Sequence, residues 1–458
     1  MSACQHFVGF GALAFALAMC GAASAFQDQL TVEIDSAPKE IPMFRPSMKG
    51  ALERLKSRTP RLPWPPNRDE QNSVNNGLFR SYYLPEEWGR RNVRPSAGVG
   101  DQPAERQARG AAGGDSSRRF DEDSLLDNGF KVRMFWIVSR VNNCHYCLGH
   151  QELKLIGAGM VEDEIARLDF NWDFFPISEQ VAFAFTRKLT ATPHLIAEQD
   201  VRNLKQHFTD DQIVELIQTV AGFNSTNRWT DSLGIPQDDR FREHPADFSV
   251  PTSDDFANVP SSVALTEEPE RPTLESRDLV LKRIADSNQR EPAISLRDLS
   301  EISPEMQQIG KRLGMSNYAR ALGAIPNSGL RQLQLVEAIR ATGRLPSMYK
   351  SQIFWAVSRE NRAWYSIGHA RKWLQEAGLN DDQIFALDAR THDDPKTEAA
   401  LNFARKLTCH SRQISDKDIH DLRERFTDHE VAEIVFITCF SNMFNFVTEP
   451  LNLPLESQ

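Results

Sequence analysis

FWIVSRVNNCHYCLGHQ at residues 135–151 returns as FWAVSRENRAWYSIGHA at residues 354–370, without a gap. Further along the chain, FTRKLT at 185–190 returns as FARKLT at 403–408. A repeat of about 219 residues is far longer than the roughly 20–50 residues of solenoid repeats. The repeat therefore indicates a duplicated domain, with two homologous halves in one chain.

The repeat divides the 458 residues into two domains. We predict a first domain over residues 26–236 and a second over 278–458. Residues 237–277, rich in Pro, Asp, Glu and Ser, predict an extended and solvated linker. The stretch 93–119 is rich in Gly and Arg and has no counterpart in the second half, so we interpret it as a disordered insertion.

The spacing of apolar residues indicates helices in both halves. In DQIVELIQTVAGF at 211–223, DHEVAEIVFITCF at 428–440 and SEQVAFAFTRKL at 178–189, apolar residues recur three and four positions apart. Each segment opens with Asp or Ser and has Glu or Gln soon after, which is typical of a helix N-terminus. No run alternates as a strand does. The sequence therefore predicts an all-α fold of two helical bundles.

Composition and charge narrow the class of protein. The formal net charge of -10 argues against a general binder of nucleic acid or of anionic membranes, because both need a dominant basic surface. We find no stretch beyond the N-terminus that is long and apolar enough to span a bilayer. These features predict a soluble protein.

The N-terminus has the pattern of a secretory signal. Residues 1–25 contain no Lys, Arg, Asp or Glu, and the run from Phe7 to Met19 is almost wholly apolar. Small residues end the segment, so we expect cleavage after Ala25 and a secreted or periplasmic protein. A retained apolar anchor and a lipoprotein processed at Cys20 are the alternatives.

The segment CHYCLGH carries the residue types that thiol chemistry needs. Cys144 and Cys147 stand where a helix begins and can lie within disulfide reach, and the helix dipole favours the first thiolate. His150, one turn past Cys147, can hydrogen-bond that sulfur and move its proton. His145 is a second titrating group, and Arg140 can supply positive field. A thiolate, a resolving thiol and a proton carrier predict a thiol peroxidase or disulfide reductase.

Asn142, Cys144, Tyr146, Cys147 and a following histidine, after an apolar helical run, resemble the carboxymuconolactone decarboxylase family and its alkylhydroperoxidase D-like branch. The resemblance covers both halves, but the cysteine motif stands only in the first. It implies an all-α oligomer that needs no cofactor, reduces a peroxide or disulfide substrate and takes electrons from a dithiol partner. It also implies that Cys147 attacks the peroxide and that Cys144 resolves.

Two positions differ from the family pattern. The family's histidine usually stands four residues after the second cysteine, where this chain has Gln151, and His150 stands one place earlier. The family's relay glutamate has no match, because Lys131 and its neighbours occupy that region. A cation there can lower a thiolate pKa but cannot act as the base at neutral pH.

The second half keeps the frame of the motif and loses the sulfurs. Ala363 and Ser366 stand in the two cysteine positions, while Arg359, Tyr365 and His369 remain. These three residues can hold buried hydrogen bonds where the halves pack together. Alternatively, His369 can transfer a proton in a cofactor-free lyase, as in the decarboxylase branch of the family.

Other interpretations of the cysteines remain open. Cys144 and Cys147 can form a purely structural disulfide in a non-catalytic helical scaffold, or half of a zinc site, although a zinc site wants four ligands and we predict no metal. Cys409 and Cys439 have no counterparts in the first half and can pair or stay as buried thiols. The favoured hypothesis is a thiol-dependent antioxidant oxidoreductase.

Overall fold

The computed structural model confirms the all-α fold. It describes residues 39–66, 74–89, 124–238, 248 and 250–456. In these ranges the only strand-like pairing is an isolated bridge between Phe44 and Pro260. The predicted signal at 1–25 and the predicted insertion at 93–119 lie outside the described residues.

The helices divide between the two halves of the chain. The first half contains α1 (Arg45–Leu55), α2 (Asn75–Tyr83), α3 (Glu86–Gly89), α5 (Asn128–Val141), α6 (His145–Gly157), α7 (Glu162–Arg167), α8 (Ile177–Ala191), α9 (Glu198–Lys205) and α10 (Asp210–Ser232), and α13 (Asp254–Ala257) lies in the predicted linker. The second contains α14 (Arg277–Asp286), α15 (Pro304–Leu313), α16 (Ser316–Leu322), α17 (Pro326–Ala341), α18 (Ser347–Asn361), α19 (Trp364–Glu376), α20 (Asp381–Ala386), α21 (Pro395–Cys409), α22 (Asp416–Arg423) and α23 (Asp428–Thr448).

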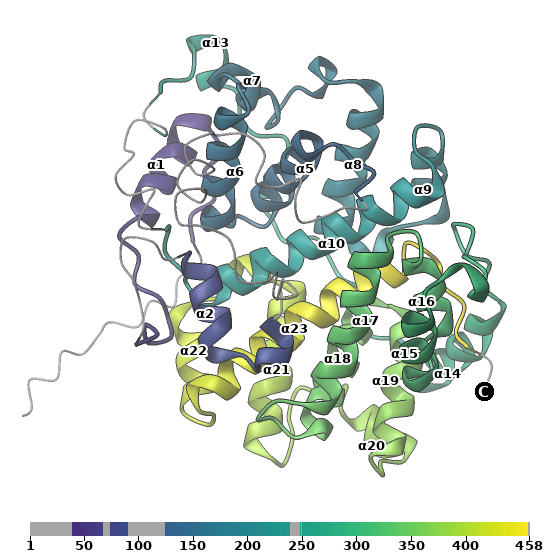
Figure 1. The fold of residues 1–458 in the computed structure, drawn as a ribbon. Helices are drawn as coiled ribbons and strands as arrows, with labels where there is room; N and C mark the ends of the chain where they lie inside the picture. The colour runs from purple at the N-terminus through teal and green to yellow at the C-terminus, as the bar shows by residue number, and fades with distance from the viewer. Residues whose placement is uncertain (1–38, 67–73, 90–123, 239–247, 249, 457–458) are drawn as a thin grey trace, which may run out of the picture. The chain divides into compact units, whose positions relative to one another are not determined.

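Both halves use the same arrangement of helices. In the first half α5 packs against α6, α8 and α10, and in the second half α18 packs against α19, α21 and α23. The two long helices α10 and α23 pack on each other between these groups (Figure 1). The segments that repeat in sequence therefore occupy matching places in the fold.

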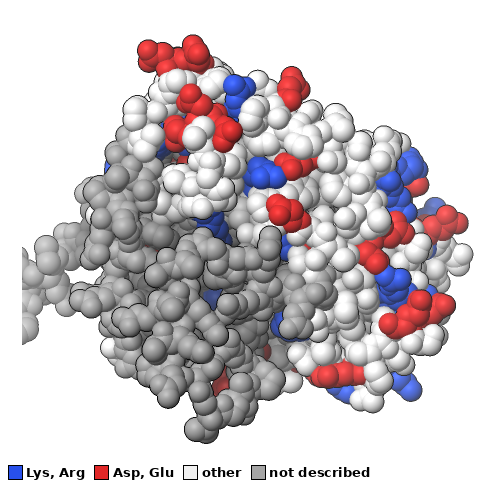
Figure 2. Space-filling view, turned by 45° about the horizontal axis from the view of Figure 1, so that its top comes forward, with Lys and Arg blue, Asp and Glu red and all other residues white. Residues whose placement is uncertain are grey.

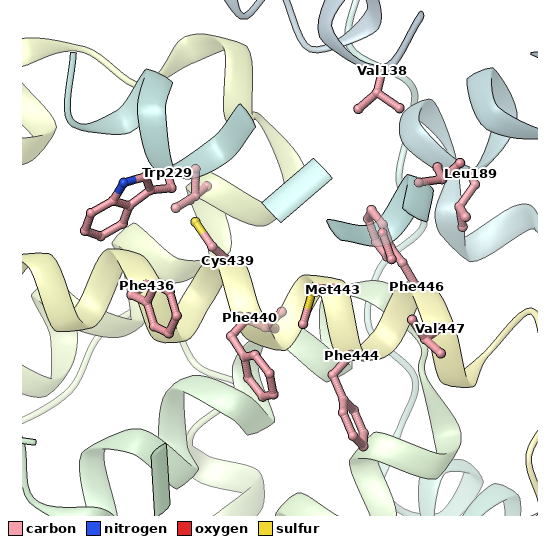
Figure 3. Packing of buried hydrophobic residues seen from close by; sticks show 14 of the residues in the cluster. Val138, Leu189, Trp229, Phe436, Cys439, Phe440, Met443, Phe444, Phe446 and Val447 are labelled. Atoms are coloured by element: carbon pink, nitrogen blue, oxygen red, sulfur yellow. The ribbon is translucent and has the colours of Figure 1, made fainter. Parts of the chain in front are cut away.

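The interface between α10 and α23 is rich in aromatic side chains. Trp229 of α10 meets Phe436 of α23 edge to face, with ring centroids 5.9 Å apart (Figure 3). The guanidinium of Arg228 lies over the ring of Phe446, 5.4 Å from its centroid. Each of these side chains is almost fully buried, so the contact removes a large apolar area from water.

The N-terminal helices of the first half also contact the second half. Trp88, at the end of α3, donates a hydrogen bond from Nε1 to Oγ1 of Thr342 at 3.0 Å. Its ring stacks on that of Phe436 with centroids 5.6 Å apart. The chain from Ala37 onward accordingly forms one compact unit that contains both halves.

The expectation that no stretch beyond the N-terminus is long and apolar enough to span a bilayer does not hold for α23. With 21 residues and a mean hydropathy of 1.5, it is long and apolar enough to cross a membrane, the one such helix among those described. All of its apolar window is buried inside the protein. A core helix passes the same test of length and composition, so α23 is weak evidence for a span.

The predicted linker has little helix, as its composition indicates, but it is not solvated along its whole length. Gln237, Asp238 and Val263 are fully buried. Arg412 of the second half donates to the carbonyl oxygens of Leu265 and Glu267, the latter at 2.9 Å. Extended backbone inside a protein needs such partners for its carbonyls. The segment therefore belongs to the folded core at several points.

Charge is mixed on the described surface. Acidic and basic side chains are interspersed over the described part of the face in Figure 2, with no continuous basic patch there. This distribution agrees with the net charge of -10.

Candidate functional site

A tight turn places the first cysteine at the start of α6. Helix α5 ends at Val141 with Asn142 as its C-cap, and Asn143 takes a left-handed conformation with φ 50°, which asparagine tolerates well. Cys144 follows as the N-cap of α6, and its amide donates to the carbonyl of Ser139 at 2.9 Å. The cysteine pair thus lies at the positive end of the α6 dipole, as the sequence predicts.

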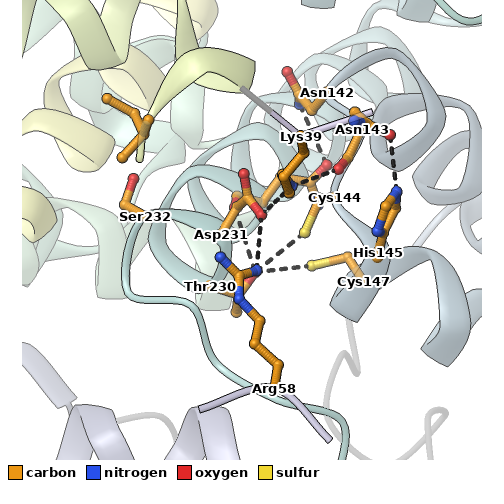
Figure 4. A network of polar contacts seen from close by, with 12 residues as sticks. Lys39, Arg58, Asn142, Asn143, Cys144, His145, Cys147, Thr230, Asp231 and Ser232 are labelled. Atoms are coloured by element: carbon orange, nitrogen blue, oxygen red, sulfur yellow. Dashed lines mark hydrogen bonds and ion pairs between the residues drawn. The ribbon is translucent and has the colours of Figure 1, made fainter. Parts of the chain in front are cut away.

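The two thiols meet at one hydroxyl group. The Sγ atoms of Cys144 and Cys147 each lie 3.3 Å from Oγ1 of Thr230 on α10 (Figure 4). Both thiols are free, and they are 0% and 2% exposed. The Thr230 hydroxyl also donates to the carbonyl of Thr226 at 3.0 Å. Because a hydroxyl has one donor and two acceptor sites, the thiols donate to it when both are protonated.

A charged cluster from the N-terminal segment lies beside the thiols (Figure 4). The ammonium of Lys39 pairs with Asp231 and donates to the carbonyl of Asn143 at 2.9 Å. Arg58 lies 3.5 Å from the same carboxylate. Lys39 and Arg58 stand outside the repeated motif, 105 and 86 residues before Cys144, and no local pattern in the sequence marks them.

The two thiols have opposite pKa shifts. Although burial and Asp231 oppose its ionisation, the pKa of Cys144 is lowered, because the Cys147 thiol, the Lys39 ammonium and the Thr230 hydroxyl stabilise its thiolate. Burial and the adjacent Cys144 sulfur raise the pKa of Cys147 well above that of an ordinary thiol. Cys144 is therefore the sulfur that ionises first.

His145 is not the titrating group that the sequence suggests. Its Nε2 lies 2.9 Å from Oδ1 of Asn143, and the residue is buried. Burial, followed by the charge of Lys39, lowers the pKa of His145 to about 3. Its imidazole is thus neutral at neutral pH and orients the turn before α6.

His150 bonds to a carboxylate rather than to the predicted sulfur. Its Nδ1 lies 2.9 Å from the carbonyl oxygen of Tyr146, and its Nε2 lies 3.1 Å from Oδ2 of Asp238. The Tyr146 hydroxyl donates to Oδ1 of the same carboxylate at 3.0 Å. The His150 ring is therefore held at both nitrogens, by a backbone carbonyl and by a buried carboxylate.

The second half contains the same three groups. The Tyr365 hydroxyl donates to Oε1 of Glu456 at 2.9 Å, and Nε2 of His369 lies 3.1 Å from Oε2. Ser366 lies 3.3 Å from Oγ1 of Thr448, which matches the contact between Cys147 and Thr230. The halves thus share a tyrosine, a histidine and a carboxylate, and differ in the sulfurs.

A glycine in each half makes room for the side chain that precedes the carboxylate. A Cβ on Gly149 would collide with Gln237, the residue just before Asp238. A Cβ on Gly368 would collide in the same way with Leu455, just before Glu456. The close approach of the chain to α6 and α19 explains why glycine precedes the histidine in both motifs.

Neither carboxylate belongs to the motif that predicts the other site residues. The spacing from Asn227 to Asn445 is the same as from Asp238 to Glu456, and this was a signal that could have found them. Asp238 falls in the stretch interpreted as linker, and the change from Asp to Glu hides the match.

The remaining predicted residues form ion pairs elsewhere. Arg140 pairs with Asp169 at 3.0 Å and donates to the carbonyl of Pro42 at 2.6 Å, so it anchors the N-terminal segment. Lys131 pairs with Glu215 at 2.9 Å. Neither of them is among the main charges that shift the pKa of Cys144. The cation among those charges is Lys39.

Arg359 makes the corresponding pair in the second half, 3.0 Å from Asp388, and a further pair with Glu275 at 3.2 Å. Arg359, Tyr365 and His369 are thus hydrogen-bonded and buried, with partners in the linker and in their own half. These partners do not place them where the two halves pack.

The other two cysteines are free, and burial raises the pKa of each to about 12. Among the described residues, no group of three or more His, Cys, Asp or Glu is arranged to hold a metal ion. No protein-family model matches this chain, and no curated protein matches it. The function of the protein is therefore inferred from the geometry of the cysteine site.

Proposed function

We propose that the protein is a thiol-dependent peroxidase or disulfide oxidoreductase in which Cys144 and Cys147 cycle between dithiol and disulfide. The observation that carries the proposal is the meeting of two free thiols at Thr230, at the N-terminus of α6 and beside Lys39. Opposite pKa shifts suit a pair in which one sulfur attacks and the other resolves.

The proposed reaction with a hydroperoxide has three steps. The Cys144 thiolate attacks the terminal peroxide oxygen, the O–O bond breaks, and the alkoxide leaves with a proton as an alcohol. The Cys147 sulfur then attacks the resulting sulfenic acid and loses its proton, so a disulfide forms and water leaves. An external dithiol reduces the disulfide and restores both thiols.

The proton in this scheme comes from the pair formed by His150 and Asp238. His150 stands one turn beyond Cys147 on α6, and its Nε2 faces the carboxylate at 3.1 Å. A histidine held by a buried carboxylate keeps its ring orientation while it gives and receives a proton. Asp238 therefore acts as a positioning residue for His150.

The resemblance of the motif to the alkylhydroperoxidase D-like branch supports the same activity, two homologous bundle domains and assembly into oligomers. It implies attack by Cys147, whereas the lowered pKa of Cys144 favours attack by Cys144. In a secreted or periplasmic protein the disulfide would persist until a dithiol partner reduced it.

Single-cysteine variants test the proposal. We expect Cys144→Ser and Cys147→Ser each to lose at least about 100-fold in hydroperoxide consumption with dithiothreitol, because turnover needs both sulfurs. Cys409→Ser with Cys439→Ser is the matched control and keeps the wild-type rate. Equal rates for wild type and the first two variants would refute the proposal.

A second candidate is a cofactor-free lyase that acts through His369. It is favoured by the repeated tyrosine, histidine and carboxylate and by Nδ1 of His369, which is buried and without a hydrogen-bond partner among the described residues. This candidate predicts activity on a carboxylated lactone that survives replacement of both cysteines and disappears in His369→Asn.

A further inference from the structure

The second half contains a cavity that the proposed thiol chemistry does not use. It has a volume of about 380 Å³ and lies between α15, α17, α18, α19 and α23. Its wall is mostly apolar and includes Leu313, Val336, Ile339, Phe354, Trp373 and Phe440. This volume lies in the range of small-molecule sites, roughly 300–1,000 Å³.

The charged groups around the cavity already have partners. Arg340 pairs with Glu376 at 3.3 Å, and its guanidinium lies over the ring of Trp373, 4.3 Å from the centroid. Glu337 accepts from Arg312 at 2.7 Å. These pairs leave the edge of the cavity with balanced charge, so it offers little to an ionic ligand.

Lys350 is held by backbone carbonyls rather than by an anion. Its ammonium donates to the carbonyl of Ile339 at 2.9 Å and to the carbonyl of Thr342, at the C-terminal end of α17. A lysine in this position caps the negative end of a helix dipole. The Lys350 ammonium is therefore hydrogen-bonded to the end of α17 and is not available as a free charge in the cavity.

The corresponding place in the first half is filled differently. Phe135, which matches Phe354, stacks on Phe223 with ring centroids 3.9 Å apart and planes 4° from parallel. The position of Phe223 is Ser441 in the second half. Phe354 packs there against Trp373 and Phe444, with ring centroids 5.0 Å and 5.4 Å away.

The other apolar walls are also specific to the second half. Trp373 stands where the first half has Lys154, and Phe440 stands where it has Gly222. The half without the cysteine motif therefore has large aromatic side chains around this cavity at positions where the first half has none.

We propose that this cavity binds a neutral, largely apolar small molecule with one or two aromatic ring systems. Phe354, Trp373 and Phe440 give the cavity apolar walls, and the paired charges at the edge favour an uncharged ligand over an anion or cation. The site is separate from Cys144 and Cys147, so binding there does not depend on the peroxidase proposal.

The test compares two fluorescent probes that differ by a sulfonate. N-phenyl-1-naphthylamine is neutral, and 1-anilinonaphthalene-8-sulfonate carries the same rings with a negative charge. We expect the full chain to bind the neutral probe saturably, with one site per chain and at least tenfold more tightly than the anionic probe. Equal binding of the two probes, or no saturable binding of the neutral one, would overturn the proposal.

Variants locate the binding to the cavity. Ser351→Phe and Ala341→Trp add rings at two lining positions, and each should weaken binding of the neutral probe at least tenfold. Ala341 is exposed at the end of α17, so its replacement leaves folding intact. Gln334→Phe, an exposed position on α17 outside the lining, is the control and keeps wild-type binding. Unchanged binding in both filled variants would contradict the assignment.

Discussion

At the scale of single residues, the site depends on groups that meet from distant parts of the chain. The cysteines and His150 could be predicted from one short motif. The motif alone does not mark Thr230, Lys39 or Asp238, because each meets it only through the tertiary fold, although the 218-residue spacing of the repeat pairs Asp238 with Glu456. A single sequence shows spacing along the chain, and these contacts span from 83 to 105 residues of it.

The charge of Lys39 should control how readily Cys144 ionises. Lys39→Met removes the ammonium that stabilises the Cys144 thiolate and leaves the opposing charge of Asp231, which Arg58 still contacts at 3.5 Å, so the pH midpoint for alkylation of Cys144 should rise. Lys39→Arg keeps a cation and should keep the wild-type midpoint. Iodoacetamide labelling at a series of pH values, read by mass spectrometry for each cysteine, measures this. A midpoint that does not change in Lys39→Met would contradict the role of this charge.

Asp238 should make stability depend on pH. Burial acts against its ionisation, but the hydrogen bond and charge of His150 lower its pKa below the usual value of about 3.9. A lowered carboxyl pKa stabilises the folded state above the unfolded-state pKa, and this contribution is lost as the pH falls through the folded-state pKa.

We therefore expect Asp238→Asn to lose about 1–3 kcal/mol of unfolding free energy at pH 7 and progressively less as the pH falls below about 4. Urea titrations of wild type and variant from pH 7 down to pH 3 measure the difference. A difference that stays constant over that range would exclude the carboxylate as its source.

At the scale of elements, helix existence follows from the 3.6-residue spacing, and the helices at 178–189, 211–223 and 428–440 are confirmed. The sequence does not predict which neighbouring elements pack around each of these helices. The apolar face of α23 continues around the helix because α10 packs on one side and the second half on the other. Composition alone cannot separate such a core helix from a membrane span.

Two glycines of α6 should respond oppositely to a methyl group. Gly149→Ala forces Gln237 and Phe248 away from the helix and should cost about 1–3 kcal/mol of unfolding free energy. Gly157→Ala, on the same helix, meets nothing within 4 Å and should be neutral or stabilising by up to about 1 kcal/mol. Chemical denaturation of both variants tests the comparison. Equal effects would mean that the chain before Asp238 does not depend on this close approach.

At the scale of the whole molecule, the repeat predicted two units of matching helices, and the contacts of α5 and α18 have that correspondence. The repeat says little about how the halves meet. Trp88 and Trp229 have no aromatic counterparts that would mark them as interface residues, yet both contact Phe436 of the second half. The sequence separates the halves by a polar stretch, whereas the structure joins them in one compact unit.

We expect the two halves to unfold together for this reason. A single denaturation transition should be seen by both circular dichroism and tryptophan fluorescence. Trp88→Ala should lower the unfolding free energy by about 3 kcal/mol, because it removes a buried indole and its bond to Thr342. Two separate transitions in wild type would show that the halves fold independently.

The reduction potential of the pair formed by Cys144 and Cys147 tests the central claim most directly. It is measured by equilibration with glutathione in the variant that lacks Cys409 and Cys439, so that only one pair can form. A redox-active pair predicts a value between about -200 and -270 mV. A value below about -300 mV would contradict the account, because such a disulfide would be structural and would not cycle.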